Sequence, residues 1–185
     1  MKDSNEMILV LGGSSSGKSH FAESLSSISG NNYYLATMQR PDIRNAYYDE
    51  IMKRIETHRK NREGKGFITL EIERDIEEKA ENAIGEWADL ILLESLSSLL
   101  SNEMFKEDVV LSEKYCEEKI YAALKLLLKK TGRLVIVSDE IFSDGIDYDE
   151  LTRKYLRSLS ALHVKIAKEA AAVYEIYYGI SRRLK

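Results

Sequence analysis

One glycine-rich segment limits what this chain can fold into more than any other. Residues 12–19 read Gly-Gly-Ser-Ser-Ser-Gly-Lys-Ser and follow the apolar run at residues 7–11. A helical pattern comes next, with apolar side chains at Phe21, Ala22, Leu25 and Ile28. A strand, a glycine-rich loop and a helix in this order predict a phosphate-binding loop, and an ordinary turn before a helix is the alternative.

The residue types of this loop suit phosphate chemistry. Gly12 and Gly17 let the backbone turn tightly and approach phosphate oxygens, because neither carries a Cβ. The loop amides and the helix start offer donors and partial positive charge to an anion. Lys18 can reach the β- and γ-phosphates, and the Ser19 hydroxyl can bind Mg²⁺. We therefore expect nucleotide binding by Gly12, Gly13, Ser14, Ser15, Ser16, Gly17, Lys18 and Ser19.

Composition and charge narrow the classes of protein to which this chain could belong. The 185 residues, 44% hydrophobic and 31% charged, suffice for one globular domain with a substantial core. A net charge of −4 gives general nucleic-acid binding no electrostatic support. No apolar run reaches the ~18 residues that span a bilayer, and residues 1–6 do not resemble a signal peptide. The single cysteine, Cys116, excludes an internal disulfide and is expected to be a packed thiol, so we expect a cytoplasmic protein.

Apolar runs alternate with helical patterns over residues 1–185, which predicts a single α/β domain. The expected strands are residues 7–11, 33–37, 67–71, 90–93, 134–137 and 173–178. The expected helices after the first are residues 46–62, 72–87, 110–130 (ended by Thr131 and Gly132) and 150–171, whereas residues 95–105 fit neither pattern. Continuous apolar runs such as residues 90–93 indicate strands covered on both faces. We therefore expect a mostly parallel sheet with helices on both faces.

Polar residues follow several expected strands, at the sheet edge where ligands collect in such folds. Glu94 directly follows residues 90–93, and a carboxylate there can hold Mg²⁺ against bound phosphates. A helix-capping or salt-bridging acid is the alternative. Further candidates at strand ends are Thr37, Ser138, Asp139 and Glu140, of which the last three suit helix capping equally well.

A basic segment at residues 54–62 is the second informative feature. On a helix, Arg54, His58 and Arg62 lie four residues apart and share one face. These cations repel one another unless an anion such as a triphosphate lies opposite. The His58 imidazole can attack a nucleoside α-phosphate while the arginines neutralise the developing charge. The alternative is a solvated basic face, and the two other histidines, His20 and His163, are expected to be structural or surface residues.

At this point the chain resembles a known family, the bifunctional adenosylcobinamide kinase / adenosylcobinamide-phosphate guanylyltransferase of cobalamin biosynthesis. The resemblance runs in the same order through nearly all of the chain. Its most specific part is Arg-Ile-x-x-His-Arg-x-x-Arg at residues 54–62, followed by Thr-x-Glu at residues 69–71. The other shared segments are residues 12–19, 34–37, 96–102 and 137–140.

The resemblance implies two reactions in a phosphate-loop, RecA-like fold. A nucleoside triphosphate first phosphorylates the aminopropanol hydroxyl of adenosylcobinamide. GTP then guanylylates a histidine, and GMP passes to the cobinamide phosphate. The implied nucleotides are ATP and GTP, with Mg²⁺, and the implied assembly is a trimer.

By the same matching, His58 is the nucleophile, and Lys18 and Ser19 contact phosphate and metal. Arg59 and Arg62 contact the nucleotide near the histidine. The resemblance also makes Glu71 and Glu94 acids of the nucleotide site.

The chain departs from the family's pattern at several positions. Glu63 follows Arg62 where the family usually has Arg-Pro, Phe67 takes the place of a tryptophan, and Glu94 stands where aspartate is frequent. Residues 181–185 replace the usual Gly-x-x-x-Lys at the carboxyl end.

The family's Asn-Glu-Val-Gly segment reads Asp139-Glu140-Ile141-Phe142, and an Asn-Gln pair in the last helix reads His163-Val164. Two alternatives therefore stay open beside the bifunctional enzyme. One is a phosphate-loop kinase of another small alcohol, and the other is a GTP-binding regulatory protein that has lost the transfer chemistry.

Overall fold

A computed structural model describes residues 5–26, 30–85, 87–106, 109–142 and 145–185. The strands of these segments are β1 (Glu6–Gly12), β2 (Asn32–Ala36), β3 (Phe67–Glu71), β4 (Ala88–Glu94), β5 (Phe105–Lys106), β6 (Val109–Val110), β7 (Thr131–Asp139), β8 (Ala172–Tyr177) and β9 (Ile180–Arg183). The helices are α1 (Lys18–Ser24), α2 (Tyr48–Arg62), α3 (Ile76–Ala83), α4 (Leu96–Met104), α5 (Glu113–Lys129) and α6 (Glu150–Glu169).

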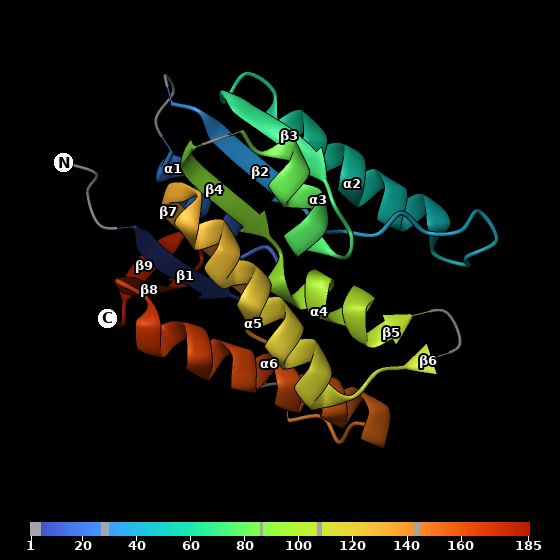
Figure 1. Ribbon diagram of the computed structural model, residues 1–185. Helices are drawn as coiled ribbons and strands as arrows, with labels where there is room; N and C mark the ends of the chain where they lie inside the picture. The colour runs from blue at the N-terminus through green and yellow to red at the C-terminus, as the bar shows by residue number, and fades with distance from the viewer. Residues whose placement is uncertain (1–4, 27–29, 86, 107–108, 143–144) are drawn as a thin grey trace.

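Within the described residues, seven strands form one sheet in the order β3-β2-β4-β7-β1-β8-β9 (Figure 1). All neighbours pair in parallel except β9, which runs antiparallel to β8. β5 and β6 form a separate two-stranded ribbon. The expected mostly parallel sheet is thus confirmed, with the strand that enters the glycine-rich loop between β7 and β8.

The apolar runs are continuous because the central strands are covered on both faces. In β4, Ile91 and Leu93 belong to the larger core cluster, whereas Leu90 and Leu92 point into the smaller one on the opposite face. β1 and β7 divide their side chains between the two clusters in the same alternation. A strand of this kind has no polar face, which is why the sequence shows no alternation of apolar and polar residues.

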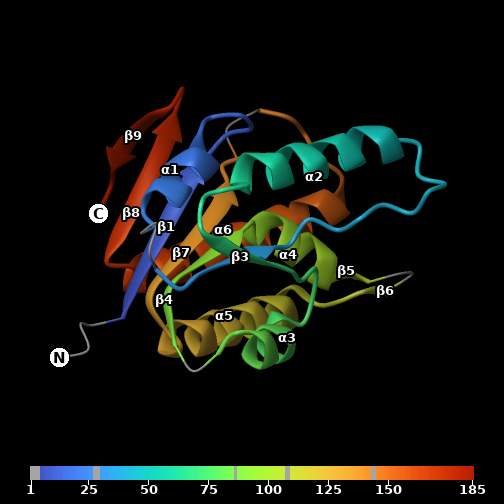
Figure 2. The same ribbon diagram turned by 90° about the horizontal axis from the view of Figure 1, so that it is seen from above.

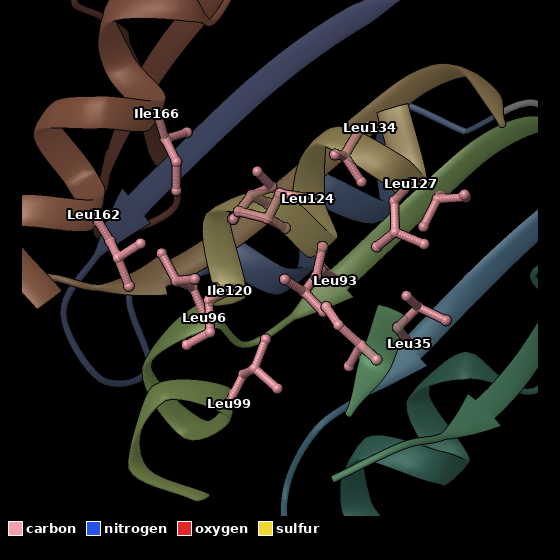
Figure 3. Packing of buried hydrophobic residues seen from close by; sticks show 14 of the residues in the cluster. Leu35, Leu93, Leu96, Leu99, Ile120, Leu124, Leu127, Leu134, Leu162 and Ile166 are labelled. Atoms are coloured by element: carbon pink, nitrogen blue, oxygen red, sulfur yellow. The ribbon is translucent and has the colours of Figure 1, made fainter. Parts of the chain in front are cut away.

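Helices cover the two faces unequally. α3, α4, α5 and α6 enclose the larger cluster, and Figure 2 shows α3 and α5 on the opposite side of the sheet from α1 and α2. In Figure 3, side chains from α4, α5 and α6 converge on residues of β2, β4 and β7. The predicted cover on both faces is confirmed, and the side that carries α2 is the thinner one.

Four elements were not expected from the sequence, namely α4, β9 and the two short strands β5 and β6. Residues 95–105 contain α4, which begins where the Ser95 side chain accepts a hydrogen bond from the Ser98 amide, a normal helix N-cap. β9 follows β8 through a tight turn in which Tyr178 and Gly179 both have positive φ, as hairpin turns require. The side chains of β9 are all exposed, so no hydrophobic pattern marks it.

Several predicted bounds were wrong. The helix expected over residues 72–87 covers only Ile76–Ala83, because the backbone at Asp75 is left-handed and breaks it. The helix expected over residues 110–130 begins only at Glu113 and ends at Lys129, close to its expected end. Thr131 and Gly132, expected to precede the next strand, already belong to β7, where Thr131 pairs with Ala88. The first helix ends at Ser24, and Ile28, Ser29, Ser143 and Asp144, which were expected in a helix or turns, lie outside the described residues.

Cys116 is fully buried in the larger cluster, which confirms the expected packed thiol. In the part of the chain that the structure describes, no helix is long and apolar enough to cross a membrane.

A partly buried histidine links α6 to the end of β7. His163 Nε2 lies 2.8 Å from the Ser138 hydroxyl, and its ring meets the edge of Phe142. Burial lowers the pKa of His163 from 6.5 to about 4, although the nearby Asp139 raises it slightly. The folded protein therefore keeps this imidazole neutral across a range in which the unfolded chain binds a proton.

This difference predicts a decrease in stability on acidification. As the pH falls from 6.5 to about 4, the unfolded state takes up a proton that the folded state does not, so the free energy of unfolding decreases. One pKa unit corresponds to ~1.4 kcal/mol, so this contribution amounts to about 3 kcal/mol at most. Urea unfolding of the wild type and of His163→Gln between pH 7 and pH 4.5 measures it. Equal pH slopes in the two proteins would contradict the assignment.

Candidate active site

The glycine-rich loop joins the carboxyl end of β1 to the start of α1. A Cβ on Gly12 would lie 2.5 Å from Ser16 Oγ and 2.8 Å from the Ile176 carbonyl oxygen, so no larger residue fits. Gly17 has a φ of 94°, in the left-handed region that favours glycine. The loop closes on itself through a hydrogen bond from the Ser16 amide to the Gly13 carbonyl. The sequence therefore folds here into the compact turn that a phosphate cradle needs.

Lys18 extends from this loop toward the end of β7. Its ammonium donates to the Gly13 carbonyl at 3.0 Å and lies 2.8 Å from Asp139 Oδ1. The other oxygen of Asp139 accepts a hydrogen bond from the Ser97 hydroxyl. The β1–β7 register places Gly12 directly opposite Asp139, so strand pairing brings this carboxylate to the loop. Asp139, the last residue of β7, therefore lines the site.

Glu94 stands at the carboxyl end of β4, two strands away from β1. One carboxylate oxygen accepts a hydrogen bond from the Ser19 hydroxyl, and the other accepts one from the Tyr34 hydroxyl. Burial first of all, and then the Glu94 charge, raises the pKa of Tyr34 above its ordinary value, so that its hydroxyl remains a donor. Glu94 thus meets the phosphate-binding loop directly rather than capping a helix.

Helix α2 forms the other wall of the site. Arg54, His58 and Arg62 do share a face of this helix, and all three line the same cavity of about 590 Å³ as Lys18 and Glu94. Arg62 is buried, and its guanidinium carbon lies 4.2 Å from the centre of the Tyr34 ring. The basic face is therefore not a purely solvated one, because it opens on the hollow that contains the phosphate-binding loop.

Glu71, at the end of β3, lies between two arginines. Arg59 Nε donates to it at 2.7 Å, and Arg40 Nη2 donates to its other oxygen at 3.0 Å. Burial alone would raise the pKa of Glu71, but the hydrogen bonds and charges of Arg59 and Arg40 lower it overall. Glu71 lines both the main cavity and a smaller hollow of about 370 Å³, which it shares with Arg59 and Arg62.

Some of the expected site residues lie outside the lining of the main cavity. Thr37 is fully buried, and its hydroxyl donates to the Ser95 carbonyl and accepts from the Ser95 amide, so it ties the ends of β2 and β4 together. Arg59 lines only the smaller hollow. Gly12 and Gly13 form the first part of the loop backbone, where Gly12 packs closely against Ser16 and Gly13 accepts a hydrogen bond from the Ser16 amide. The expected residues that do line the main cavity are Ser14, Ser15, Ser16, Gly17, Lys18, Ser19, His58, Arg62, Glu71 and Glu94.

Two of the later departures from the family's pattern are in contact. The Phe142 ring meets His163 edge-on, and His163 Nε2 lies within hydrogen-bond distance of the Ser138 hydroxyl. Asp139, next to Ser138 in the sequence, acts electrostatically on His163. Val164 is about half exposed.

The residues near Ser19 suit a divalent cation held jointly with a nucleotide. Among the described residues, no group of three or more His, Cys, Asp and Glu side chains is placed to hold a metal ion. Ser19 and Glu94 nevertheless bring a hydroxyl and a carboxylate oxygen into contact, which are the hard donors that Mg²⁺ prefers. Such an ion takes most of its remaining ligands from phosphate and water, so this donor set fits.

Neither Tyr34 nor Arg40 was among the predicted site residues, although Tyr34 belongs to a segment shared with the family. Tyr34 reads as an ordinary strand residue, and Arg40 lies in the segment between β2 and α2. Both line the cavity because β2 ends beside β4 and β3. Strand order was the missing information, since it decides which side chains meet at the sheet edge.

Solved structures with a similar fold include two archaeal proteins. The flagellar accessory protein FlaH from Methanocaldococcus jannaschii superimposes with a TM-score of 0.51 at 14% identity, covering 99% of this chain and 79% of its own. The KaiC-like protein PH0186 from Pyrococcus horikoshii OT3 gives a TM-score of 0.51 at 14% identity, with 93% and 71% covered. At this identity the likeness concerns the fold, and it supports the predicted phosphate-loop NTPase-like class.

Proteins related by sequence identify the family, and not only the fold. The bifunctional adenosylcobalamin biosynthesis protein CobU of Escherichia coli (strain K12) is 28% identical over 97% of this chain and 99% of its own length. The bifunctional adenosylcobalamin biosynthesis protein CobP of Pseudomonas aeruginosa is 30% identical, with 96% of each chain covered. The family described as cobinamide kinase / cobinamide phosphate guanyltransferase matches residues 8–184. With this match over nearly its whole length, the chain belongs to the cobinamide kinase / cobinamide phosphate guanyltransferase family.

Proposed function

We propose that this single domain phosphorylates adenosylcobinamide and then transfers GMP to the product through a guanylylated His58. The observation that carries the proposal is that Lys18 and His58 line one cavity, although 40 positions separate them in the sequence. A phosphate-binding loop alone would serve many reactions. A histidine between two arginines on the facing helix supplies the additional group that nucleotidyl transfer needs.

In the first reaction, the loop amides and Lys18 hold the β- and γ-phosphates of the triphosphate. Ser19 and Glu94 would hold Mg²⁺, and the ion would supply positive charge to the phosphate oxygens. The acceptor hydroxyl attacks the γ-phosphorus, the bond to the β-phosphate oxygen breaks, and the nucleoside diphosphate leaves. The protein contributes mainly position and electrostatics, as in other phosphoryl transfers.

In the second reaction, a nitrogen of His58 attacks the α-phosphorus of GTP and pyrophosphate leaves. Arg54 and Arg62, one turn before and one turn after His58, neutralise the charge that develops on the phosphoryl oxygens. The phosphate oxygen of the cobinamide phosphate then attacks the same phosphorus, and the N–P bond breaks. Dividing the transfer into two displacements lets one site serve both substrates in turn.

Further parts of the proposal rest on the family rather than on the geometry. They are Mg²⁺ as the divalent ion, ATP and GTP as the nucleotides, a corrinoid acceptor, a trimer with three times the 21.2 kDa mass of one chain, and a location in the cytoplasm.

Two other functions are distinguished by what the protein transfers. A kinase of another small alcohol moves the γ-phosphate and forms no adduct with the α-phosphate. A regulatory protein binds GTP and transfers nothing. The contacts of Lys18 and Ser19 serve nucleotide binding in all three functions, so the group that is transferred decides between them.

The guanylylated histidine gives the first prediction about the transfer reactions. Incubation with α-labelled GTP and Mg²⁺ should attach up to about one GMP per chain through a bond that is labile in acid and stable in base, as a phosphoimidazole is. Peptide mass analysis should locate the adduct on His58, and His58→Ala should carry none. His20→Ala, which changes an exposed histidine of α1, is the matched control and should label normally. An adduct that persists in His58→Ala would rule out this nucleophile.

The phosphate-binding loop gives the second. Lys18→Met removes the ammonium that we place on the β- and γ-phosphates, so kcat/KM for γ-phosphate transfer to adenosylcobinamide should fall by about 10²- to 10³-fold. Lys114→Met, at an exposed position of α5, is the control for loss of a lysine. Equal rates in the two variants would contradict the role of Lys18. Transfer to other alcohols but not to the corrinoid, in the wild type, would instead favour the general kinase.

A further inference from the structure

We propose that Tyr34 is a positioning residue that links the phosphate-binding loop side of the site to helix α2. Its hydroxyl orients Glu94. Its ring holds Arg62, and through Arg62 it positions the helix that carries His58. The inference rests on the proposed function, because it assigns Glu94 to the metal and His58 to the transfer. It goes further in making one buried side chain responsible for the relative placement of both.

The hydroxyl of Tyr34 acts on the phosphate side. It donates to one oxygen of Glu94, while Ser19 donates to the other. Two donors at the two oxygens fix both the position and the rotation of the carboxylate. Without the hydroxyl, the Glu94 carboxylate is held at one oxygen only, and a ligand of Mg²⁺ that can rotate binds the ion less well.

The ring of Tyr34 acts on the side of α2. The Arg62 guanidinium lies 4.2 Å from the ring centre, a normal distance for a cation–π contact. Arg62 is only 8% exposed, and its Nε atom is buried without a hydrogen-bond partner in the described structure. The aromatic face is therefore the main contact shown for this buried cation. Phe67 meets the same ring edge-on, at 5.7 Å between centroids, and keeps it from turning.

Arg62 matters for His58 because α2 has few other attachments. The buried residues of this 15-residue helix are Ile55 and Arg62. His58 lies between them in the sequence. It is about one helical turn before Arg62, on the same face of α2. Apart from the ion pair of Arg59 with Glu71, the contact of Arg62 with Tyr34 is therefore what sets the angle at which this end of α2 presents His58 to the cavity.

Two substitutions separate the two contacts. Tyr34→Phe keeps the ring under Arg62 and removes the hydroxyl from Glu94. Tyr34→Leu removes both. Tyr33→Phe is the matched control, because Tyr33 is the adjacent buried tyrosine and its side chain packs into the core on the opposite face of the sheet.

Tyr34→Phe should raise the Mg²⁺ concentration that half-saturates GTP binding, measured by calorimetry, by about tenfold. At saturating Mg²⁺ its single-turnover rate of GMP transfer to His58 should fall by less than about threefold. Tyr34→Leu should show the same Mg²⁺ effect and should also slow GMP transfer by about 10- to 100-fold, because the nucleophile is misplaced. Tyr33→Phe should change neither quantity.

Hydrogen exchange tests the contact with α2 without any turnover. Amides of residues 48–62 should exchange faster in Tyr34→Leu, but not in Tyr34→Phe, and Arg62→Gln should reproduce the faster exchange with Tyr34 intact. Equal Mg²⁺ half-saturation and equal exchange in all variants would overturn the proposal. So would a lower thermal stability in Tyr34→Phe and Tyr34→Leu together with the same proportional decrease in their rates of GMP transfer. A wild type that forms no His58 adduct refutes the proposed function, whereas the calorimetric and exchange results still decide the role of Tyr34.

Discussion

The parallel pairing of β1 with its neighbours is the constraint on which the site depends. Its register sets Gly12 opposite Asp139 of β7, and the pairing of β2 sets Ala36 opposite both Glu71 and Glu94. The carboxyl ends of β1, β3, β4 and β7 therefore meet at one edge of the sheet, as parallel strands require. A phosphate-binding loop and three carboxylates come together there before any helix is considered. The buried strand interiors, which share their side chains between two cores, keep this register from slipping.

The parts of the fold that could be predicted are those with a local signal. The phosphate-binding loop has its glycines, and β4 and β7 have uninterrupted apolar runs because both of their faces are covered. α4 was missed because its polar serines hide a buried leucine face, and β9 was missed because it buries nothing. Within the site, the shared face of Arg54, His58 and Arg62 follows from helix geometry. The contacts of Lys18 with Asp139 and of Tyr34 with Glu94 could not be predicted, since they depend on strand order.

The unequal helix packing on the two faces of the sheet matches the different roles of the groups in the site. Four helices pack over the larger core and support the sheet from that side. On the other side, α2 packs with only two buried residues. The groups that need fixed geometry, Lys18, Ser19 and Glu94, come from the strand ends and the loop. The group proposed to form a covalent bond comes from the loosely attached helix. Of the altered positions, Phe142 and His163 contact each other, and Asp139 acts electrostatically on His163.

The ion pair between Lys18 and Asp139 has a consequence for ligand binding. In the proposed binding mode, a phosphate does not meet a bare ammonium but exchanges with a carboxylate that the fold holds permanently beside it. Such an internal anion behaves as a tethered competitor, whose effective concentration is fixed by geometry and does not fall on dilution. The affinity for nucleotide is then set by the difference between two anions. Only a ligand that brings more negative charge than one carboxylate, or a cation to share, gains from the exchange.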